Sequence, residues 1–290
     1  MNKIALGTVQ FGMKYGISNQ SGIVSPEEII SILKTAAKFG IDTLDTAINY
    51  KDSESKLGQN NLSNFKIITK IPKLPSQFDD IKSWVFNHFQ SSLQRLKVSN
   101  IYGLLLHSPE DLLGINGPLI YNALRTLKDS GKILKIGISI NSFDTLEKIL
   151  DLYKFDLIQS PFNLIDRRLL NTGFLNRLKD EKYEVHTRSV FLQGLLLMNE
   201  CNRPTQFSKW NPLWNEASKW CSNNSVSLLQ SAIQFPLSFA EIDRVVVGIE
   251  NTEQLIEINQ AAFNDKNIQS YPDIECEDLD LINPSKWFSF

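Results

Sequence analysis

Three ionisable side chains follow three successive apolar segments of the chain, and their types suit proton transfer. Asp45 ends the segment 43–45, Lys70 ends the segment 66–70, and His107 follows the run 101–106. Tyr50 lies shortly after Asp45. A carboxylate, an ammonium, an imidazole and a phenol can together perform general acid–base chemistry. Each residue type is ordinary at such a position by itself, so the hypothesis depends on all of them converging.

The elements that would position these residues alternate along the chain. Short apolar segments, several of them continuous runs typical of strands buried on both faces, are separated by longer amphipathic segments. The predicted strands are 4–7, 43–45, 66–70, 101–106, 135–139, 157–159, 184–188 and 245–247. The predicted helices are 26–39, 81–96, 119–130, 143–152, 167–181, 228–237 and 252–262.

Local signals mark the ends of two predicted helices. Ser25 is a good N-cap, Pro26 suits the first helical position, and Glu28 completes a capping box. Gly40 stands where this helix should stop. The segment 251–254, Asn-Thr-Glu-Gln, is a second capping-box pattern.

The count of elements predicts a single α/β domain, a (β/α)8 TIM barrel covering residues 1–290 with a C-terminal tail from about residue 270 to 290. Eight βα units would each take about 36 residues, as such a barrel requires, and its functional groups gather at the carboxyl ends of the strands. We expect a long loop at 199–212 and an extra amphipathic segment at 213–221. The alternative is a doubly wound sheet, but Gly7, Gly12 and Gly16 lack the G-x-G-x-x-G spacing.

Composition narrows the class of protein. The 290 residues carry 30 basic and 32 acidic side chains, a net charge of -2, which disfavours a nucleic-acid binder. No apolar run is long enough to span a membrane, and the N-terminus lacks the pattern of a signal peptide. Cys201, Cys221 and Cys276 are scattered, so we expect neither disulfides nor a metal site, and a cytoplasmic location is the simplest.

The chain resembles the aldo-keto reductase family over nearly its whole length. The resemblance rests on the segments 6–8, 40–47 with Tyr50, Lys70, the leucine-rich run into His107, 131–139, Gln159 and 247–248. It implies a barrel that reduces a carbonyl with NADPH or NADH, or performs the reverse oxidation. It also implies a catalytic tetrad of Asp45, Tyr50, Lys70 and His107. Tyr50 would donate the proton, Lys70 held by Asp45 would favour the phenolate, and His107 would orient the substrate carbonyl.

The resemblance also implies a cofactor site. Ser139 and Gln159 match residues that hold the nicotinamide amide, whereas the asparagine that often follows the serine stands one position later, at Asn141. Arg188 takes the place of an aromatic residue that stacks on the nicotinamide, and a guanidinium can stack similarly. The following loop should pass near the pyrophosphate with free main-chain N–H groups, through Ser189, Phe191, Gln193 and Gly194.

The last βα unit departs from the family. Many members carry Lys or Arg there for the adenosine 2′-phosphate, but Glu250, Asn251 and Gln254 follow Gly248 here. Gly248, Asn251, Gln254 and also Glu257 still suit an adenosine site. NADP is the family default as cofactor, and this departure leaves NAD open.

Substrate selection is expected to come from loops. Residues after the first strand could wall the pocket, and the C-terminal tail could either cover the barrel mouth or pack on the outer helices; the wall candidates are Val9, Gln10, Phe11, Met13 and Tyr15. The expected partner is a small carbonyl compound, such as a sugar derivative, and the oligomeric state is open. His88 is expected on a helix surface, and His186 is expected to point into the helix layer.

Two other functions fit parts of the sequence. One is a regulatory subunit that binds the cofactor with little turnover. The other is a barrel aldolase or isomerase in which Lys70 forms a Schiff base, which the neighbouring Asp45 and Tyr50 disfavour.

Overall fold

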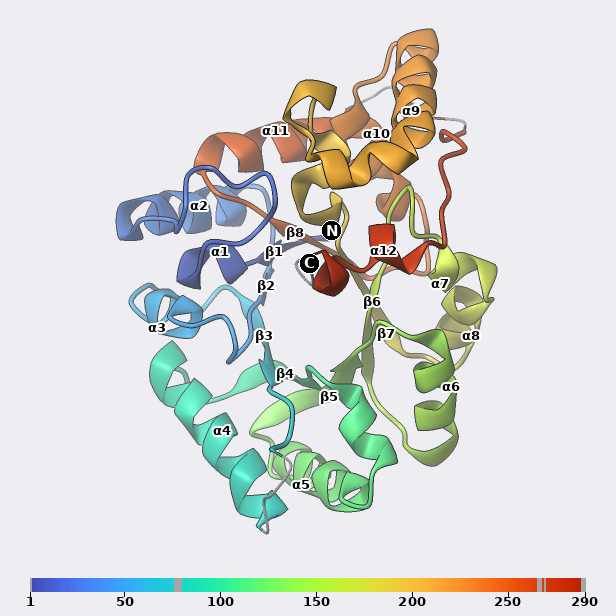
Figure 1. The fold of residues 1–290 in the computed structure, drawn as a ribbon. Coiled ribbons are helices and arrows are strands. Elements are labelled where there is room, and N and C mark those ends of the chain that lie inside the picture. Colours follow the sequence, from blue (N-terminus) through green and yellow to red (C-terminus); the bar gives the residue numbers. More distant parts are fainter. Residues whose placement is uncertain (1, 76–79, 265–267, 269, 288–290) are drawn as a thin grey trace.

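Eight parallel strands close into a barrel in the computed structural model, which describes residues 2–75, 80–264, 268 and 270–287. Each strand pairs with the next along the chain, and the last pairs with the first (Figure 1). The predicted barrel is confirmed, and the open-sheet alternative is wrong. The strands are β1 Ile4–Gly7, β2 Thr43–Asp45, β3 Lys66–Ile71, β4 Ile101–Leu106, β5 Ile133–Ser139, β6 Leu157–Pro161, β7 Glu184–Arg188 and β8 Arg244–Gly248.

Helices surround the barrel, and the large apolar core lies between them and the strands (Figure 1). The helices are α1 Val9–Gly12, α2 Pro26–Lys38, α3 Ser53–Leu57, α4 Ile81–Leu96, α5 Gly117–Asp129, α6 Phe143–Leu152, α7 Arg168–Asn171, α8 Phe174–Asp180, α9 Asn211–Asn224, α10 Leu228–Leu237, α11 Thr252–Ala262 and α12 Leu279–Ile282. None of them, in the part of the chain that the structure describes, is long and apolar enough to cross a membrane.

Two predicted elements differ from the structure. The helix predicted over 167–181 is split into α7 and α8, because Gly173 adopts a φ of 78° between them. The loop predicted over 199–212 contains the 3₁₀ turns Glu200–Asn202 and Thr205–Trp210 and then the start of α9, which includes the expected amphipathic segment. Propensity and periodicity alone locate such boundaries poorly, because single turns depend on tertiary packing.

Hydrogen bonds link the N-terminal ends of α2 and α11. Ser25 caps α2 as predicted by accepting from the Glu28 amide. The Glu28 carboxylate, however, does not complete a capping box: its Oε1 accepts from the amide and hydroxyl of Thr252, at 2.5 and 2.7 Å. The side chain therefore serves the N-terminus of the neighbouring helix rather than its own.

The interior of the barrel is apolar in its middle and polar toward both ends. Ile68, Leu105 and Leu157 form a small buried cluster separate from the outer core. Residues two positions further along a strand lie on the same face, so Lys70 and Gln159 emerge above this cluster. The apolar layer thus forms the floor on which the polar residues stand.

One of the two histidines outside the tetrad is placed differently from the expectation. His186 is fully buried and contacts the Glu184 carboxylate at 2.6 Å, and Glu184 in turn pairs with Tyr102 and Lys135 of β4 and β5. It therefore lies inside the barrel, not in the helix layer. His88 lies on α4, as expected, where it is half-buried and edge-on to the Trp84 ring.

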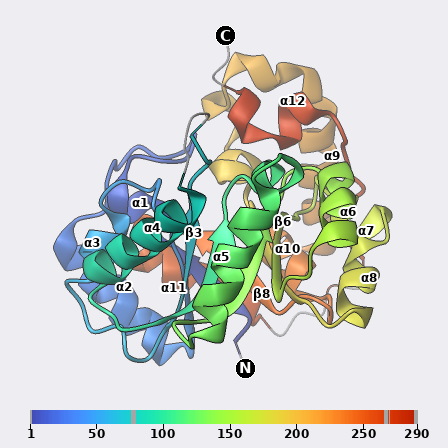
Figure 2. The same ribbon diagram turned by 90° about the horizontal axis from the view of Figure 1, so that it is seen from below.

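The C-terminal tail covers the mouth of the barrel. Figure 2 shows α12 at one end of the barrel, and the residues that follow it, Asn283, Pro284 and Ser285, line the cavity at the carboxyl ends of the strands (Figure 1 gives the view onto the barrel). Trp287 anchors the tail: its side chain is buried edge-on to Phe207, with ring centroids 5.0 Å apart. The covering position is thus the correct alternative for the tail. Residues 288–290, the end of the predicted tail, lie outside the described residues.

Candidate active site

A cavity of about 1000 Å³ lies at the carboxyl ends of the strands. Three of the four predicted tetrad residues, Asp45, Tyr50 and His107, line its wall. The fourth, Lys70, lies beneath them with a side chain only 1% exposed. The structure therefore brings the four residues together as the sequence predicts.

A buried ion pair forms the base of the site. The Nζ of Lys70 donates to Oδ1 of Asp45 at 2.6 Å and to the main-chain carbonyl of Thr46 at 2.9 Å. The other carboxylate oxygen of Asp45 accepts from Nε2 of Gln159 at 2.7 Å. Burial lowers the pKa of Lys70, whereas the charge of Asp45 raises it. Asp45 thus favours the ammonium form in a place where burial alone would disfavour it.

Tyr50 and His107 stand above this pair. Their rings meet edge-on, with centroids 5.8 Å apart, and the ammonium of Lys70 lies 5.4 Å from the centroid of the Tyr50 ring. Burial, together with the neighbouring cations Lys70 and Arg188, lowers the pKa of His107 to about 4. The imidazole is therefore neutral at physiological pH.

The pKa of Tyr50 differs from the expectation that a cation lowers it. Burial raises the pKa of the phenol above its ordinary value, the negative charge of Asp45 raises it further, and Arg188 opposes this. Burial is the largest of these effects, so the pKa of the phenol is raised although cations lie nearby. Tyr50 consequently holds its proton in this arrangement.

A network of buried hydroxyl groups holds the turn that carries Tyr50. The Ser53 hydroxyl donates to the carbonyl of Thr8 at 2.8 Å and lies 2.9 Å from the Thr8 hydroxyl and 3.1 Å from that of Thr46. Gly12 packs so tightly on this turn that an added Cβ would lie 1.8 Å from the carbonyl oxygen of Tyr50. The position of Tyr50 is therefore set by contacts with the β1 end.

The predicted nicotinamide-binding residues lie together beside the tetrad. Ser139 donates to Oε1 of Gln159 at 3.3 Å, and Nε of Arg188 donates to the Ser139 hydroxyl at 3.3 Å. Asn141, shifted by one position in sequence, also reaches the cavity, where its Oδ1 accepts from Arg188 at 2.7 Å. These four side chains form one continuous polar wall.

The loop after β7 has an unusual backbone. Ser189, Leu192, Gln193 and Gly194 all have positive φ values, between 50° and 89°. Such conformations cost free energy at non-glycine residues and concentrate at functional sites. The expected free N–H groups are partly used within the loop, because the amides of Leu192 and Gly194 donate to the carbonyls of Ser189 and Phe191.

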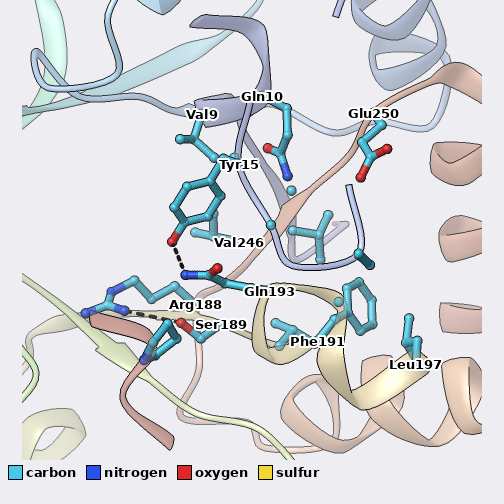
Figure 3. A pocket seen from close by; sticks show the side chains of 18 of the residues that line it. Val9, Gln10, Tyr15, Arg188, Ser189, Phe191, Gln193, Leu197, Val246 and Glu250 are labelled. Atoms are coloured by element: carbon cyan, nitrogen blue, oxygen red, sulfur yellow. Dashed lines mark hydrogen bonds between the residues drawn. The ribbon is translucent and has the colours of Figure 1, made fainter. Parts of the chain in front are cut away.

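This loop is joined to the loop after β1. The Nε2 of Gln193 donates to the Tyr15 hydroxyl at 2.9 Å (Figure 3). The Ile17 amide donates to the Gln193 carbonyl at 3.1 Å. Val9, Gln10, Met13 and Tyr15 line the cavity, as expected for residues after the first strand, whereas Phe11 is fully buried in the core. The β1 and β7 loops thus form two joined walls.

The far end of the cavity is formed by the last βα unit. Gly248, Glu250, Gln254 and Glu257 line it, but Asn251 does not. Asn251 instead caps α11 by accepting from the Gln254 amide at 2.8 Å, and Oε1 of Gln254 accepts from the Glu250 amide at 2.8 Å. The predicted cap is therefore present, and Asn251 serves the helix.

The family model for the aldo/keto reductase family matches residues 3–275. The chain belongs to this family. It is accordingly an NAD(P)-dependent oxidoreductase with a TIM barrel fold.

Curated relatives of this aldo/keto reductase include sugar dehydrogenases. The chain is 27% identical over 264 residues to the L-galactose dehydrogenase of Arabidopsis thaliana, covering 84% of this chain and 80% of that protein. It is 27% identical over 293 residues to the D-threo-aldose 1-dehydrogenase of a Pseudomonas species, covering 87% and 89%. Both alignments span most of the barrel.

Solved structures agree with the fold. The glycerol dehydrogenase of Gluconobacter oxydans superimposes with a TM-score of 0.72 at 20% identity, covering 92% of this chain and 88% of that one. The holo form of an aldo-keto reductase from Bacillus halodurans gives a TM-score of 0.71 at 18% identity, with the same coverage. At these identities the likeness concerns the fold alone.

The residues of this aldo/keto reductase suit a nicotinamide dinucleotide. The cavity is at the upper end of the size range for small-molecule sites. Two buried polar atoms on its wall, Nδ1 of His107 and Oε1 of Gln10, have no hydrogen-bond partner among the described residues. The Gln10 side chain packs against Gly248 at the end of β8. A Cβ added to Gly248 would lie 2.7 Å from Nε2 of Gln10. Buried polar atoms without partners are costly, so a polar ligand would stabilise this wall.

The structure adds residues that the sequence did not indicate. The cavity mouth is lined by polar residues of the tail and of the segment before α9, namely Asn199, Asn202, Asn283 and Ser285. They carry no motif and lie far from the tetrad in sequence. Only the folding of the tail and of the segment before α9 against the barrel brings them to the site.

Proposed function

We propose that this oxidoreductase reduces an aldehyde or ketone of a polyhydroxylated, sugar-like compound, and catalyses the reverse oxidation, with Tyr50 as the general acid. The observation that carries the proposal is the buried Asp45–Lys70 pair beneath Tyr50 and His107, at the wall of the large cavity. Proton donors of this kind accelerate carbonyl chemistry by about 10²–10⁴-fold.

The proton transfer is assigned to Tyr50. Ser139, Gln159 and Arg188 would hold the nicotinamide ring, which would supply a hydride to the carbonyl carbon when bound. As negative charge develops on the substrate oxygen, the phenol O–H bond breaks and its proton passes to that oxygen. The ammonium of Lys70, held by Asp45, then stabilises the phenolate left on Tyr50.

His107 would orient the substrate carbonyl. Its lowered pKa keeps the imidazole neutral, so the ring presents one donor and one acceptor nitrogen. We assign Nε2 to the substrate carbonyl. The Nδ1 atom is buried without a partner among the described residues, so it would pair with a second polar group of the ligand. A neutral ring also avoids a third positive charge beside Lys70 and Arg188.

The wall of the cavity favours a neutral substrate with several hydroxyl groups. Amide and hydroxyl side chains predominate near its mouth, namely Asn199, Asn202, Asn283 and Ser285. Such groups both donate and accept, as polyols require. The names of the curated relatives, an L-galactose dehydrogenase and an aldose dehydrogenase, agree with this substrate class.

The Schiff-base alternative is disfavoured by the position of Lys70. Its side chain is 1% exposed and its ammonium is bonded to Asp45 and Thr46, so it does not offer a free amine to a carbonyl.

The test is turnover of a panel of aldoses and simple aldehydes, followed by cofactor absorbance, for wild type and Tyr50→Phe. Removing the phenolic proton should lower kcat by about 10²–10⁴-fold with KM changed much less. The matched control is Tyr15→Phe, which removes another phenol from the same cavity and should lower kcat less than about tenfold. Near-wild-type kcat in Tyr50→Phe would refute the proposal. Dinucleotide binding without turnover on any carbonyl would favour the regulatory-subunit alternative.

A further inference from the structure

The far end of the cavity is acidic. Glu250 and Glu257 line it, and Figure 3 shows the Glu250 carboxylate turned toward the cavity, across from Arg188. Glu250 is half-buried, and burial raises its pKa while a hydrogen bond with Ser21 opposes this. A ligand group at this end would therefore meet carboxylates.

Two amides of the helix terminus at this end already have partners within the protein. A helix N-terminus commonly binds phosphate through its free amides. At α11, however, the Thr252 amide donates to the Glu28 carboxylate and the Gln254 amide donates to Asn251. The Glu250 amide just before the helix donates to Gln254. The protein thus places its own carboxylate, Glu28, where an external phosphate would otherwise be stabilised.

Basic residues lie elsewhere around the cavity. Among the described residues, the lysines and arginines that line it are Lys14, on the exposed loop after β1, and Arg188, beside the tetrad. Arg188 is bonded to Ser139, Asn141 and the Ile140 carbonyl. The last βα unit contributes no lining cation in the described part of the chain.

We propose that this protein prefers NAD(H) over NADP(H) and that Glu250 is the residue that determines this preference. Its carboxylate accepts hydrogen bonds from the adenosine ribose hydroxyls and repels a 2′-phosphate, which carries between one and two negative charges near neutral pH. The inference rests on the proposed function, because it assumes that the nicotinamide lies at the tetrad and the adenosine at the far end.

The experiment measures binding without chemistry. The protein is titrated calorimetrically at about pH 8, where carboxylates are ionised, with NAD⁺ and NADP⁺. A second pair of probes, 5′-AMP and 2′,5′-ADP, differs only by the 2′-phosphate and reports on the adenosine end alone. We expect the probe without the 2′-phosphate to bind at least about tenfold more tightly in each pair, with the difference shrinking at high salt.

Variants assign the preference to its residue. Glu250→Gln keeps the shape and removes the charge, so it should tighten NADP⁺ binding about 5–10-fold and change NAD⁺ binding less. Glu250→Arg should reverse the preference. The control is Glu253→Gln, which removes the same charge from the exposed first turn of α11 without lining the cavity, and should leave the ratio unchanged.

Two results would overturn the inference. One is NADP⁺ binding as tightly as NAD⁺ in the wild type. The other is an unchanged ratio in Glu250→Gln, which would place the discrimination elsewhere. Failure of the proposed function is distinguishable: it would appear as preferential NAD⁺ binding with no Tyr50-dependent turnover, whereas Tyr50-dependent turnover with NADPH preferred would contradict the inference alone.

Discussion

The buried pair of Asp45 and Lys70 can be tested by removing one charge at a time. Lys70→Met keeps an unbranched side chain and leaves the Asp45 carboxylate with the Gln159 amide, at 2.7 Å. Asp45→Asn keeps the side-chain shape and leaves the ammonium bonded to the carbonyl of Thr46, at 2.9 Å. Each single variant therefore leaves an uncompensated charge among buried groups.

The geometry sets the magnitude. The charged atoms are 2.6 Å apart, and the two side chains are 1% and 5% exposed. Two unit charges at that distance attract by about 6 kcal/mol at an effective dielectric constant of about 20. Desolvation offsets part of this, and removing one partner of a buried pair typically costs about 3–5 kcal/mol of unfolding free energy. The double variant leaves no unpaired charge and should therefore cost about 2–3 kcal/mol less than the sum of the single variants.

Urea unfolding of the wild type, both single variants and the double variant measures this coupling. The control is Lys179→Met, which breaks the exposed pair with Asp243 (3.2 Å; 43% and 31% exposed) and should cost less than about 1 kcal/mol. A coupling energy below about 1 kcal/mol would refute the description of Asp45 and Lys70 as an energetically coupled buried pair.

The pH dependence of the Asp45→Asn variant gives an independent readout. Burial lowers the pKa of Lys70 and Asp45 opposes this, so losing Asp45 should lower it further. In the unfolded variant, Lys70 keeps its proton up to its ordinary pKa of 10.5. In the folded variant, Lys70 has already lost the proton at lower pH. The unfolding free energy of Asp45→Asn should therefore begin to rise with pH at a lower pH than that of the wild type, and it should rise over a wider range up to that value. An onset at the same pH in both proteins would contradict the assigned role of Asp45.

The remaining predictions concern three other residues. Because the pKa of His107 is lowered from 6.5 to about 4, the unfolded chain binds its proton first on acidification. Stability should therefore fall between those pH values, less so in His107→Gln, and kcat/KM, which reports the free enzyme, should stay level until about pH 5; a decline in kcat/KM centred near 6.5 would contradict the lowered pKa. Gly12→Ala should displace the Tyr50 turn, since the new Cβ would lie 1.8 Å from its carbonyl oxygen, and lower kcat about tenfold or more with unchanged circular dichroism. Trp287→Ala should free the tail from Phe207. Limited proteolysis would detect this as early cleavage near the C-terminus, and steady-state kinetics as a higher KM. Protection from proteolysis equal to that of the wild type would show that Trp287 does not anchor the tail.

Much of the barrel could be predicted because its signals are local. Continuous apolar runs marked the strands, and the end of each run placed Asp45, Lys70 and His107 on one side of the barrel. Helix-end signals were less complete. The Ser25 cap is local and was predicted, whereas the partner of Glu28 lies on a helix more than two hundred residues away.

The last βα unit likewise has features that are local in the sequence and others that depend on the packed structure. The absence of basic residues after Gly248 is visible in the sequence. That Glu250 lines the cavity while Asn251 turns to its helix follows only from the packed structure, because a capping residue and a ligand-binding residue look alike in sequence.

By itself the sequence determined the (β/α)8 fold and the residue types of the tetrad, because periodicity and strand ends are properties of short segments. Only the tertiary structure decided the protonation of the site, since the pKa values of Tyr50 and His107 depend on burial and on charges from other strands. It also decided what closes the cavity. The tail and the β1 and β7 loops meet over the barrel through contacts between residues far apart in the chain, which no local pattern encodes.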